Sequence, residues 1–463
     1  RTVRLRRSPV GTTPEGNVSS STEATTESGA IARYFEFAKH GTNLRTESVA
    51  GLTTFLAMAY IVFVNPDILS ATGMDQGAVF VATAVAAAIG TLIMGLWAKL
   101  PIAQAPGMGL NAFFAFSVVI GLGVPWERAL AATMASGVIF LVLALTGARK
   151  AIIDAIPVQL KLAVGAGIGL FIAFIGLKQA GIVVADEATT VTVGSLTEPT
   201  TVLAVFGIVV TAVLLTRGVR AAVFYGIVAT SIAGIATGLI DVPSAVVSSP
   251  PSLSPTFGAA FSEFGNLLNA DMLVVVFTML FVDFFDTAGT LIAVTRQGGL
   301  MTPEGEIPGG MKPLTADAIA TVAGGALGTS TTTSYIESAA GVGAGGRTGF
   351  TSVVTGALFL LTLLFSPLLG VVTEQVTAAA LVVVGLMMAR PLSEILWSEW
   401  EYGIPAFLVV ATMPLTYSIA TGIALGLVLF PLLMAVRGKA REVSPTMWGL
   451  MVLFVAYFAF FAE

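Results

Sequence analysis

Apolar runs, many of them about twenty residues long, follow one another along most of the chain and are separated by short polar stretches. A helix of that length crosses the hydrocarbon core of a bilayer. We therefore predict an all-α polytopic membrane protein with about 14 transmembrane segments. The first series of segments lies at 49–70, 77–98, 106–121, 128–147, 158–183, 200–216 and 221–240. The second series lies at 270–294, 315–327, 333–344, 348–368, 372–389, 402–413 and 416–436.

The polar stretches divide the chain into six parts. In chain order these are a disordered cytoplasmic tail (1–30), an amphipathic lead-in (31–48), a first repeat with spans 1–7 (49–240), an extracellular linker (241–269), a second repeat with spans 8–14 (270–437) and a C-terminal apolar segment (438–463). The tail is rich in Ser, Thr, Gly and Pro and lacks the apolar region of a secretory signal peptide. The run 446–462 either spans the membrane or lies at its interface.

Composition strengthens the membrane prediction. Hydrophobic residues make up 56% of the chain and charged residues only 11%, against roughly 25% charged residues in an ordinary soluble domain. The absence of cysteine excludes disulfides and thiolate metal sites. The single histidine, His40, precedes the first run and is predicted to be a solvated loop residue. No long basic tract suggests nucleic acid.

The distribution of basic residues tests the predicted crossings. With a cytoplasmic N-terminus and one crossing per segment, 20 of the 22 Lys and Arg residues fall on the cytoplasmic side, and only Arg128 and Lys178 do not. The positive-inside rule predicts this asymmetry, which a single miscounted early segment would destroy. The sequence therefore indicates a multi-pass protein of the plasma or inner membrane.

Two series of seven segments predict a 7+7 inverted repeat, because an odd number of crossings makes the second copy enter from the opposite side. Residues 60–67 (YIVFVNPD) weakly resemble 278–285 (TMLFVDFF) in the opening segment of each half. The third segment of each half is irregular.

The two irregular segments are predicted to form the binding site. In the first half, 104–111 (QAPGMGLN) interrupts a helix with Pro and Gly. In the second half, 328–337 (GTSTTTSYIE) is rich in β-branched hydroxyl residues that favour extended backbone. Non-helical backbone at membrane depth persists only inside protein or beside a water-filled cavity. Two breaks in corresponding positions are typical of a transporter's binding site.

Carboxylates inside apolar segments are the strongest candidates for chemistry. Asp283 and Asp286 share one face of the eighth segment, and Glu337 follows the second break. Each aspartate at the centre of a membrane helix costs about 2.5–3.5 kcal/mol on insertion scales, which favours a function. Asp67 either has a function or caps a helix, and Asp317 is predicted to be an N-cap.

Other functions fit the sequence less well. The pattern G-x-G-x-x-G at 341–346 follows no strand of a βαβ unit, so a dinucleotide site is rejected. No phosphate-binding loop motif for ATP is present. An intramembrane aspartyl protease remains a remote alternative, but such a protease has no evident need for paired broken helices. We therefore expect neither an enzyme nor a cofactor or metal site.

Four stretches carry a resemblance to a known family: 50–69, 105–116, 281–292 and 329–353. Together they resemble the AzgA-like hypoxanthine/guanine permeases of the nucleobase–cation symporter (xanthine/uracil permease) family. The resemblance covers about residues 30–463. It implies a core domain of spans 1–4 and 8–11 and a gate domain of spans 5–7 and 12–14, with short strands in broken segments 3 and 10.

The resemblance also implies roles for individual residues. Asp283 and Glu337 would contact the base, Asn111 would line the site with Thr333 and Ser334, and Asp286 would support it, these carboxylates also carrying the coupled proton. The histidine motif of the xanthine branch is absent from the first span, which favours hypoxanthine, guanine and adenine. A homodimer through the gate domains is a further expectation.

Carboxylates accept hydrogen bonds from the ring N–H groups of a purine, and an amide can donate to its carbonyls. The alternatives left open are an anion exchanger of the same fold and a pyrimidine or xanthine permease. An anion site with three acidic residues and no central basic residue would be electrostatically poor.

Overall fold

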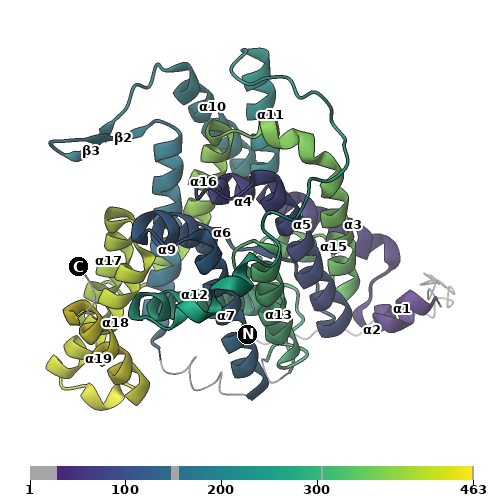
Figure 1. The fold of residues 1–463 in the computed structure, drawn as a ribbon. Helices are drawn as coiled ribbons and strands as arrows, with labels where there is room; N and C mark the ends of the chain where they lie inside the picture. Colours follow the sequence, from purple (N-terminus) through teal and green to yellow (C-terminus); the bar gives the residue numbers. More distant parts are fainter. Residues whose placement is uncertain (1–28, 147–155, 304–305, 461–463) are drawn as a thin grey trace, which may run out of the picture.

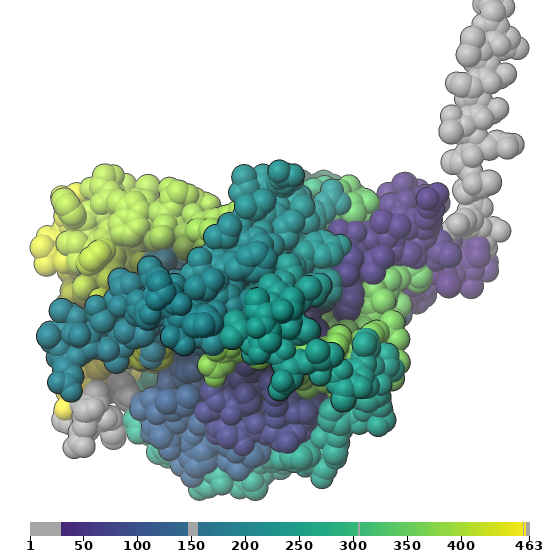
Figure 2. Space-filling view, turned by 90° about the horizontal axis from the view of Figure 1, so that it is seen from above, coloured from purple at the N-terminus to yellow at the C-terminus, as the bar shows by residue number. Residues whose placement is uncertain are grey.

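A computed structural model describes residues 29–146, 156–303 and 306–460. Almost all of the predicted tail 1–30 therefore lies outside the described residues. Figure 1 shows the arrangement of the helices. The short helices α1 (Ala30–Tyr34) and α2 (Phe37–His40) occupy the predicted lead-in and lie at the edge of the molecule in both views (Figures 1 and 2).

The remaining helical elements follow the predicted segments. In the first half they are α3 (Leu44–Met58), α4 (Ile61–Ser70), α5 (Gln76–Ile93), the π-helical η1 (Met94–Ala98), α6 (Met108–Ala112), the π-helical η2 (Phe113–Gly121), α7 (Trp126–Thr146), α9 (Val158–Gln179), α10 (Pro199–Thr216) and α11 (Ala222–Ala236). The second half comprises η3 (Ala259–Leu267), α12 (Ala270–Gln297), α13 (Lys312–Leu327), α14 (Ser338–Gly343), α15 (Gly349–Thr362), η4 (Leu363–Val371), α16 (Glu374–Ala389), η5 (Arg390–Glu394), α17 (Trp400–Thr416), α18 (Ile419–Val436), η6 (Ala440–Glu442) and α19 (Pro445–Phe460).

Each of the fourteen predicted segments coincides with helical structure, which confirms the polytopic α-helical fold. Within the described ranges, nine helical stretches are long and apolar enough to cross a membrane. Shorter apolar helices occur at Met108–Gly121, Ala222–Ala236 and Pro445–Ala456. The count of fourteen crossings stays a prediction, as does the position of α19 relative to the bilayer.

The helices pack as two units. In the core unit α13 packs on α7 and α5, and α15 packs on α5 and α3. In the gate unit α9 packs on α16 and α17, while α10 packs on α11 and α16. In Figure 1 the helices α3, α5 and α15 lie at the right, and α9, α17 and α18 lie at the left. This division agrees with the core and gate domains that the resemblance implies.

Hydrogen bonds between described residues cross the boundary between these units, which we call the core–gate seam. Arg220, just before α11, donates to the carbonyl oxygen of Gly343 on α14 (3.4 Å). Thr377 on α16 donates to Asp67 on α4 (2.8 Å). Ser231 on α11 donates to the carbonyl oxygen of Val371 (3.1 Å). Ser117 on η2 donates to the carbonyl oxygen of Tyr417, which lies between α17 and α18 (3.0 Å).

The first span begins earlier than the hydropathy pattern predicts. Asn43 caps α3 by accepting a hydrogen bond from the backbone of Thr46 (2.9 Å). Glu47 in the first turn is buried, and it accepts hydrogen bonds from the hydroxyls of Thr348 (2.9 Å) and Thr351 (2.6 Å) at the start of α15. Partnering at the N-terminus of another helix lets a carboxylate lie inside the structure.

Two features outside the core were not predicted. The fifth segment was expected to reach residue 183, but α9 ends at Gln179. A hairpin of β2 (Val183–Asp186) and β3 (Thr190–Val193) follows it and projects at the upper left of Figure 1. Nothing in the apolar pattern distinguishes these valines from the end of a membrane helix.

The linker 241–269 contains the 3₁₀ helix η3 and is fastened to the core. Arg128 of α7 forms an ion pair with Glu263 of η3 (2.9 Å), and Asn266 donates to the same oxygen (2.9 Å). The hydrogen bonds from Asn266 and Arg128, together with the positive charge of Arg128, lower the pKa of Glu263. One of the two basic residues predicted outside the cytoplasm therefore anchors the linker.

Candidate functional site

The two irregular segments meet in the core unit. Strand β1 (Gln104–Pro106) pairs antiparallel with β4 (Thr332–Ser334), so that Ala105 lies opposite Thr333. The backbone N–H of Gly107 donates to the carbonyl of Thr331 (2.9 Å), and that of Tyr335 donates to Ala103 (2.9 Å). Extended backbone at this depth thus satisfies its polar groups by pairing the two breaks with each other. The short strands implied by the resemblance are confirmed.

Helices α6 and α14 leave the paired strands in the two halves. Gly107 is the N-cap residue of α6, and Glu337 is the N-cap residue of α14. The glycines of α14 allow close packing on the first span: a Cβ at Gly341 would lie 2.0 Å from the hydroxyl oxygen of Thr54. This contact explains the glycine-rich pattern that superficially matches a dinucleotide motif.

Two of the predicted carboxylates are accessible. Asp286 on α12 is exposed although it lies in the middle of a long helix, and Glu337 is partly exposed. The hydroxyl of Tyr60, between α3 and α4, donates to Oε1 of Glu337 (2.9 Å). A charged or hydrogen-bonding ligand that enters the core unit from the accessible side meets these groups first.

The third predicted carboxylate, Asp283, lies one helical turn from Asp286 and is 1% exposed. Its Oδ2 accepts a hydrogen bond from Thr321 of α13 (3.0 Å), and the same hydroxyl also lies within hydrogen-bonding distance of the carbonyl of Thr332 (2.9 Å). Its Oδ1 has no hydrogen-bond partner among the described residues. A buried acceptor without a donor is costly, which makes this oxygen a candidate for a ligand N–H group.

The amide of Asn111 presents the complementary case. Asn111 on α6 is fully buried, and its Oδ1 accepts a short hydrogen bond from Ser330. Its Nδ2 has no hydrogen-bond partner among the described residues. Because α6 contacts α12, the core unit holds an unused donor and an unused acceptor on neighbouring helices.

Thr333 and Ser334 are buried in strand β4. The hydroxyl of Thr333 shares a hydrogen bond with that of Thr287 on α12 (2.7 Å). The hydroxyl of Ser334 donates to Oδ1 of Asp317 (2.9 Å). Both side chains therefore fasten β4 to neighbouring helices in the present conformation.

The prediction that Asp317 is an N-cap is wrong. Met311 occupies the N-cap position of α13, and Asp317 lies inside the helix with no exposed surface. Besides Ser334, its Oδ1 accepts hydrogen bonds from Thr287 (2.7 Å) and from Nε2 of Gln104 on β1 (2.9 Å). The α13 helix begins at Lys312, before the apolar run, and this extra turn carries Asp317 inward.

Asp317 thus joins both strands and α12 through one oxygen. Sequence reasoning did not single out Gln104, Thr287, Thr321 or Tyr60 as site residues. Gln104 opens the first break, which was the available signal, whereas the threonines on α12 and α13 resemble ordinary helix residues.

Asp67 does not cap a helix either, since it lies within α4 and accepts the hydrogen bond from Thr377 described above. Its neighbour Asn65 is fully buried and donates to the hydroxyls of Thr83 (2.7 Å) and Thr329 (2.8 Å). The structure therefore assigns Asn65 to the support of the second break and Asp67 to the seam.

Comparisons with known proteins agree with this geometry. A model of the permease family matches residues 45–425. The guanine/hypoxanthine permease PbuG of Bacillus subtilis (strain 168) is 53% identical over 436 residues, which cover 92% of this chain and 99% of the relative. The adenine permease AdeP of Escherichia coli (strain K12) is 42% identical over 439 residues, which cover 95% of this chain and 98% of the relative.

A solved structure is also similar. The transmembrane domain of a cyanobacterium bicarbonate transporter, BicA, has a TM-score of 0.62 at 16% identity, with 82% of this chain and 97% of that chain covered. At that identity the likeness concerns the fold alone. The family match over most of the chain and the identity to named permeases show that the chain belongs to the xanthine/uracil permease family.

Proposed function

We propose that this protein imports purine nucleobases, hypoxanthine and guanine first and adenine as a further candidate, by symport with protons. The observation that carries the proposal is that Oδ1 of Asp283 and Nδ2 of Asn111, an acceptor and a donor on neighbouring helices of the core unit, have no hydrogen-bond partner among the described residues. A purine base offers an N–H donor for the first and a carbonyl acceptor for the second. The names of the relatives, guanine/hypoxanthine and adenine permeases, support the same substrate class.

In this proposal Glu337 and Asp286 meet the base as it enters, and Asp283 with Asn111 holds it within the core unit. Thr333 and Ser334 keep β4 in place beside the base and contact it when their present partners shift. Tyr60 orients Glu337 through its hydroxyl. The base therefore lies between α12 and the two paired strands.

The carboxylates of this site are also the proposed proton carriers. Residues 281–292 and 329–340 contain three acidic residues, Asp283, Asp286 and Glu337, and no basic residue. Carboxylates that gather at membrane depth without a basic partner resist simultaneous ionisation. Asp283, Asp286 and Glu337 would titrate as one coupled group. Binding that is tightest in one protonation state makes uptake depend on external pH.

Proteoliposomes test the coupling. A hypoxanthine pulse should acidify the lumen, and a protonophore should stop accumulation of the base. The control is an otherwise identical preparation of the Glu337→Gln variant, which should show neither signal. Accumulation that persists with the proton gradient collapsed but requires sodium would overturn proton coupling while leaving the purine site intact.

The anion exchanger is the second candidate, because BicA shares the fold. The accessible groups of the site are carboxylates, which repel an anion. Uptake of radiolabelled hypoxanthine should be competed by guanine but not by bicarbonate, sulfate or uracil. Competition by an inorganic anion would favour the exchanger, and competition by uracil would favour a pyrimidine permease.

Orientation and assembly complete the proposal. The basic residues favour a cytoplasmic N-terminus in the plasma or inner membrane, and the family resemblance favours a homodimer through the gate domains. Because the chain has no cysteine, single cysteines at Lys439 and at Glu187 give a direct test. An impermeant thiol reagent applied to intact cells should label the second site and not the first. Light scattering of the purified protein would measure the number of chains.

A further inference from the structure

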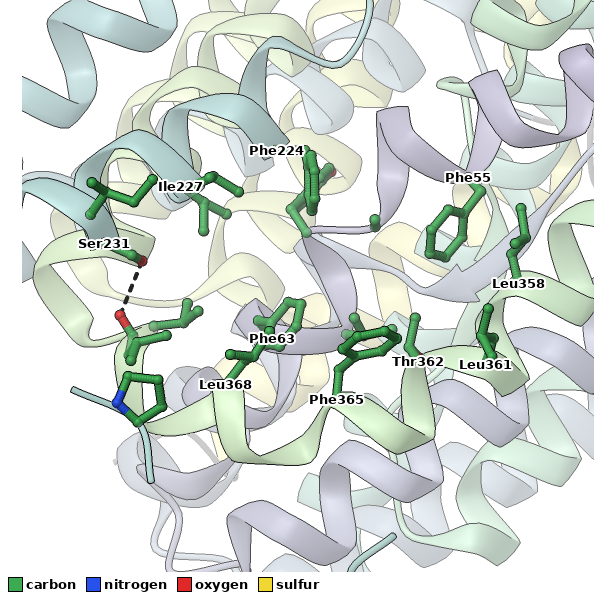
Figure 3. A pocket seen from close by; sticks show the side chains of 18 of the residues that line it. Phe55, Phe63, Phe224, Ile227, Ser231, Leu358, Leu361, Thr362, Phe365 and Leu368 are labelled. Carbon is green, nitrogen blue, oxygen red and sulfur yellow. Dashed lines mark hydrogen bonds between the residues drawn. The ribbon is translucent and has the colours of Figure 1, made fainter. Parts of the chain in front are cut away.

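A cavity of about 420 Å³ opens within the core–gate seam (Figure 3), next to the proposed base site, where its lining residue Tyr60 is hydrogen-bonded to Glu337. In Figure 3, Phe224, Ile227 and Ser231 of the gate helix α11 face Phe63 and Leu368 of the core unit. The cavity thus draws its walls from two packing units, and its volume lies in the range of small-molecule pockets.

The walls offer almost no polar group to a ligand. Three of the lining residues carry hydroxyls, and each hydroxyl already has a partner. Ser231 donates to the carbonyl of Val371 (3.1 Å), the bond drawn in Figure 3. Thr362 donates to the carbonyl of Phe359 (2.6 Å), and Tyr60 donates to Glu337 (2.9 Å). A purine base placed here would leave its own donors and acceptors unsatisfied, so the occupant must be apolar.

The cavity is continuous with the apolar surface that a bilayer surrounds. Ile232 and Val228 on α11 line it and are 61% and 38% exposed, and Leu361 on α15 is 49% exposed. Leu361 lies on an apolar stretch long enough to cross a membrane (Gly349–Val371), and Val228 and Ile232 lie on the shorter apolar helix Ala222–Ala236 of the facing unit. The nearest apolar material in quantity is therefore the hydrocarbon of the membrane itself.

We propose that this cavity is a binding site for one acyl chain of a membrane lipid, which enters between α11 and α15. The chain fills the space between core and gate, with its headgroup left in the interface outside. Because no charged side chain of the described residues lines the cavity, the site selects the hydrocarbon chain and not the headgroup. The proposal is independent of the identity of the transported base.

Photolabelling tests the proposal on the full chain in proteoliposomes. Phosphatidylcholine with a diazirine near the end of one acyl chain is the probe, and mass spectrometry locates the adducts. We expect adducts at Phe63, Phe224 and Leu368, in excess of those on the exposed face of α10. Phosphatidylglycerol with the same labelled chain should give the same pattern. Labelling confined to outward faces such as α10, or a strong dependence on the headgroup, would overturn the proposal.

A filled cavity provides the second measurement. Ile227→Trp places a large ring inside the space, and Val209→Trp on the exposed face of α10 is the matched control (Val209 is 54% exposed). Adducts inside the cavity should fall several-fold in the first variant and stay at the wild-type level in the second. If Ile227→Trp does not fold, Val228→Phe at the entrance replaces it. Unchanged cavity labelling in a folded, filled variant contradicts an acyl chain at this position.

Discussion

The two halves of the chain each contribute a broken helix to the site, but the side chains that they contribute differ. The first half contributes amides, Asn65, Gln104 and Asn111. The second half contributes carboxylates, which are Asp283, Asp286, Asp317 and Glu337. An amide both donates and accepts, whereas an ionised carboxylate only accepts. The repeated architecture therefore places two broken segments together, and the divergence of the side chains supplies the mixture of donors and acceptors that a purine edge requires.

The carboxylates of the second half also differ from one another in the number of hydrogen bonds that they accept. Asp317 accepts three hydrogen bonds through one oxygen and has no exposed surface. Asp283 is equally buried but accepts one hydrogen bond, from Thr321. Like Asp317, it keeps its second oxygen without a partner among the described residues. Asp286 is exposed. The number of partners thus separates a carboxylate that holds the strands from those that are available to a base or a proton.

The largest effect is expected from the available carboxylates. Asp283→Asn and Glu337→Gln should each weaken purine binding by about 1.5–3 kcal/mol, or roughly ten- to a hundredfold, because a hydrogen bond to a charged group is lost. Binding of hypoxanthine to the purified variants measures this loss. Glu187→Gln on the exposed hairpin is the control and should bind like the wild type. Wild-type affinity in either site variant would remove that residue from the base site.

A smaller effect on binding, with a clear effect on stability, is expected at Asp317. Asp317→Asn can keep one oxygen facing the three donors but loses the carboxylate charge that strengthens these hydrogen bonds, and should destabilise the fold by about 1–3 kcal/mol. Thr287→Val removes only one of the three donors and should cost less. Melting temperatures in detergent rank the variants. If Asp317→Asn retained full thermal stability but lost base binding, Asp317 would belong with the ligand groups instead.

In the first half, the amide of Asn111 should contribute less than the charged groups. Asn111→Ala removes a neutral donor, so a loss of about 0.5–1.5 kcal/mol in base binding is expected. Asn65→Ala should lower stability without a matching change in affinity, since the hydrogen bonds that Asn65 makes among the described residues go to Thr83 and Thr329. Equal losses of affinity in both variants would contradict the distinction between binding and supporting amides.

The smallest effect concerns the linker. Because the pKa of Glu263 is lowered in the folded protein, its ionised side chain stabilises the fold. This stabilisation is fully present above the pKa that Glu263 has in the unfolded chain. That contribution is lost as the pH falls through the lowered value in the folded protein. The melting temperature of the wild type should therefore approach that of Glu263→Gln as the medium is acidified. A difference that stays constant across this range would show that Glu263 acts by packing alone.

Apolar run length and charge asymmetry predicted the membrane class and the order of the helices, because both depend on local composition. The paired breaks were also visible, since Pro, Gly and β-branched hydroxyl residues act locally. The role of Asp317 was not visible from sequence. It depends on where Gln104 and Ser334 lie in space, and they are distant in the chain from each other.

The hairpin β2–β3 and the cavity in the seam show the same limit. Valines that end a helix and valines that pair in a hairpin have the same hydropathy, so only the turn geometry separates them. The lining of the cavity comes from α3, α4, α11, α15 and η4, and no local pattern indicates that these surfaces fail to fill the space between them.

The pairing of β1 with β4 has a mechanical consequence. All the groups proposed to hold the base lie on elements that these strands bind into one body, so the base can be carried without loosening any of them. Movement of the core unit relative to the gate unit then requires hydrogen bonds of the core–gate seam to break. These include the pairs Asp67–Thr377, Ser117–Tyr417 and Ser231–Val371. Recognition of the base and resistance to movement of the core unit thus depend on different surfaces, and either can change without altering the other.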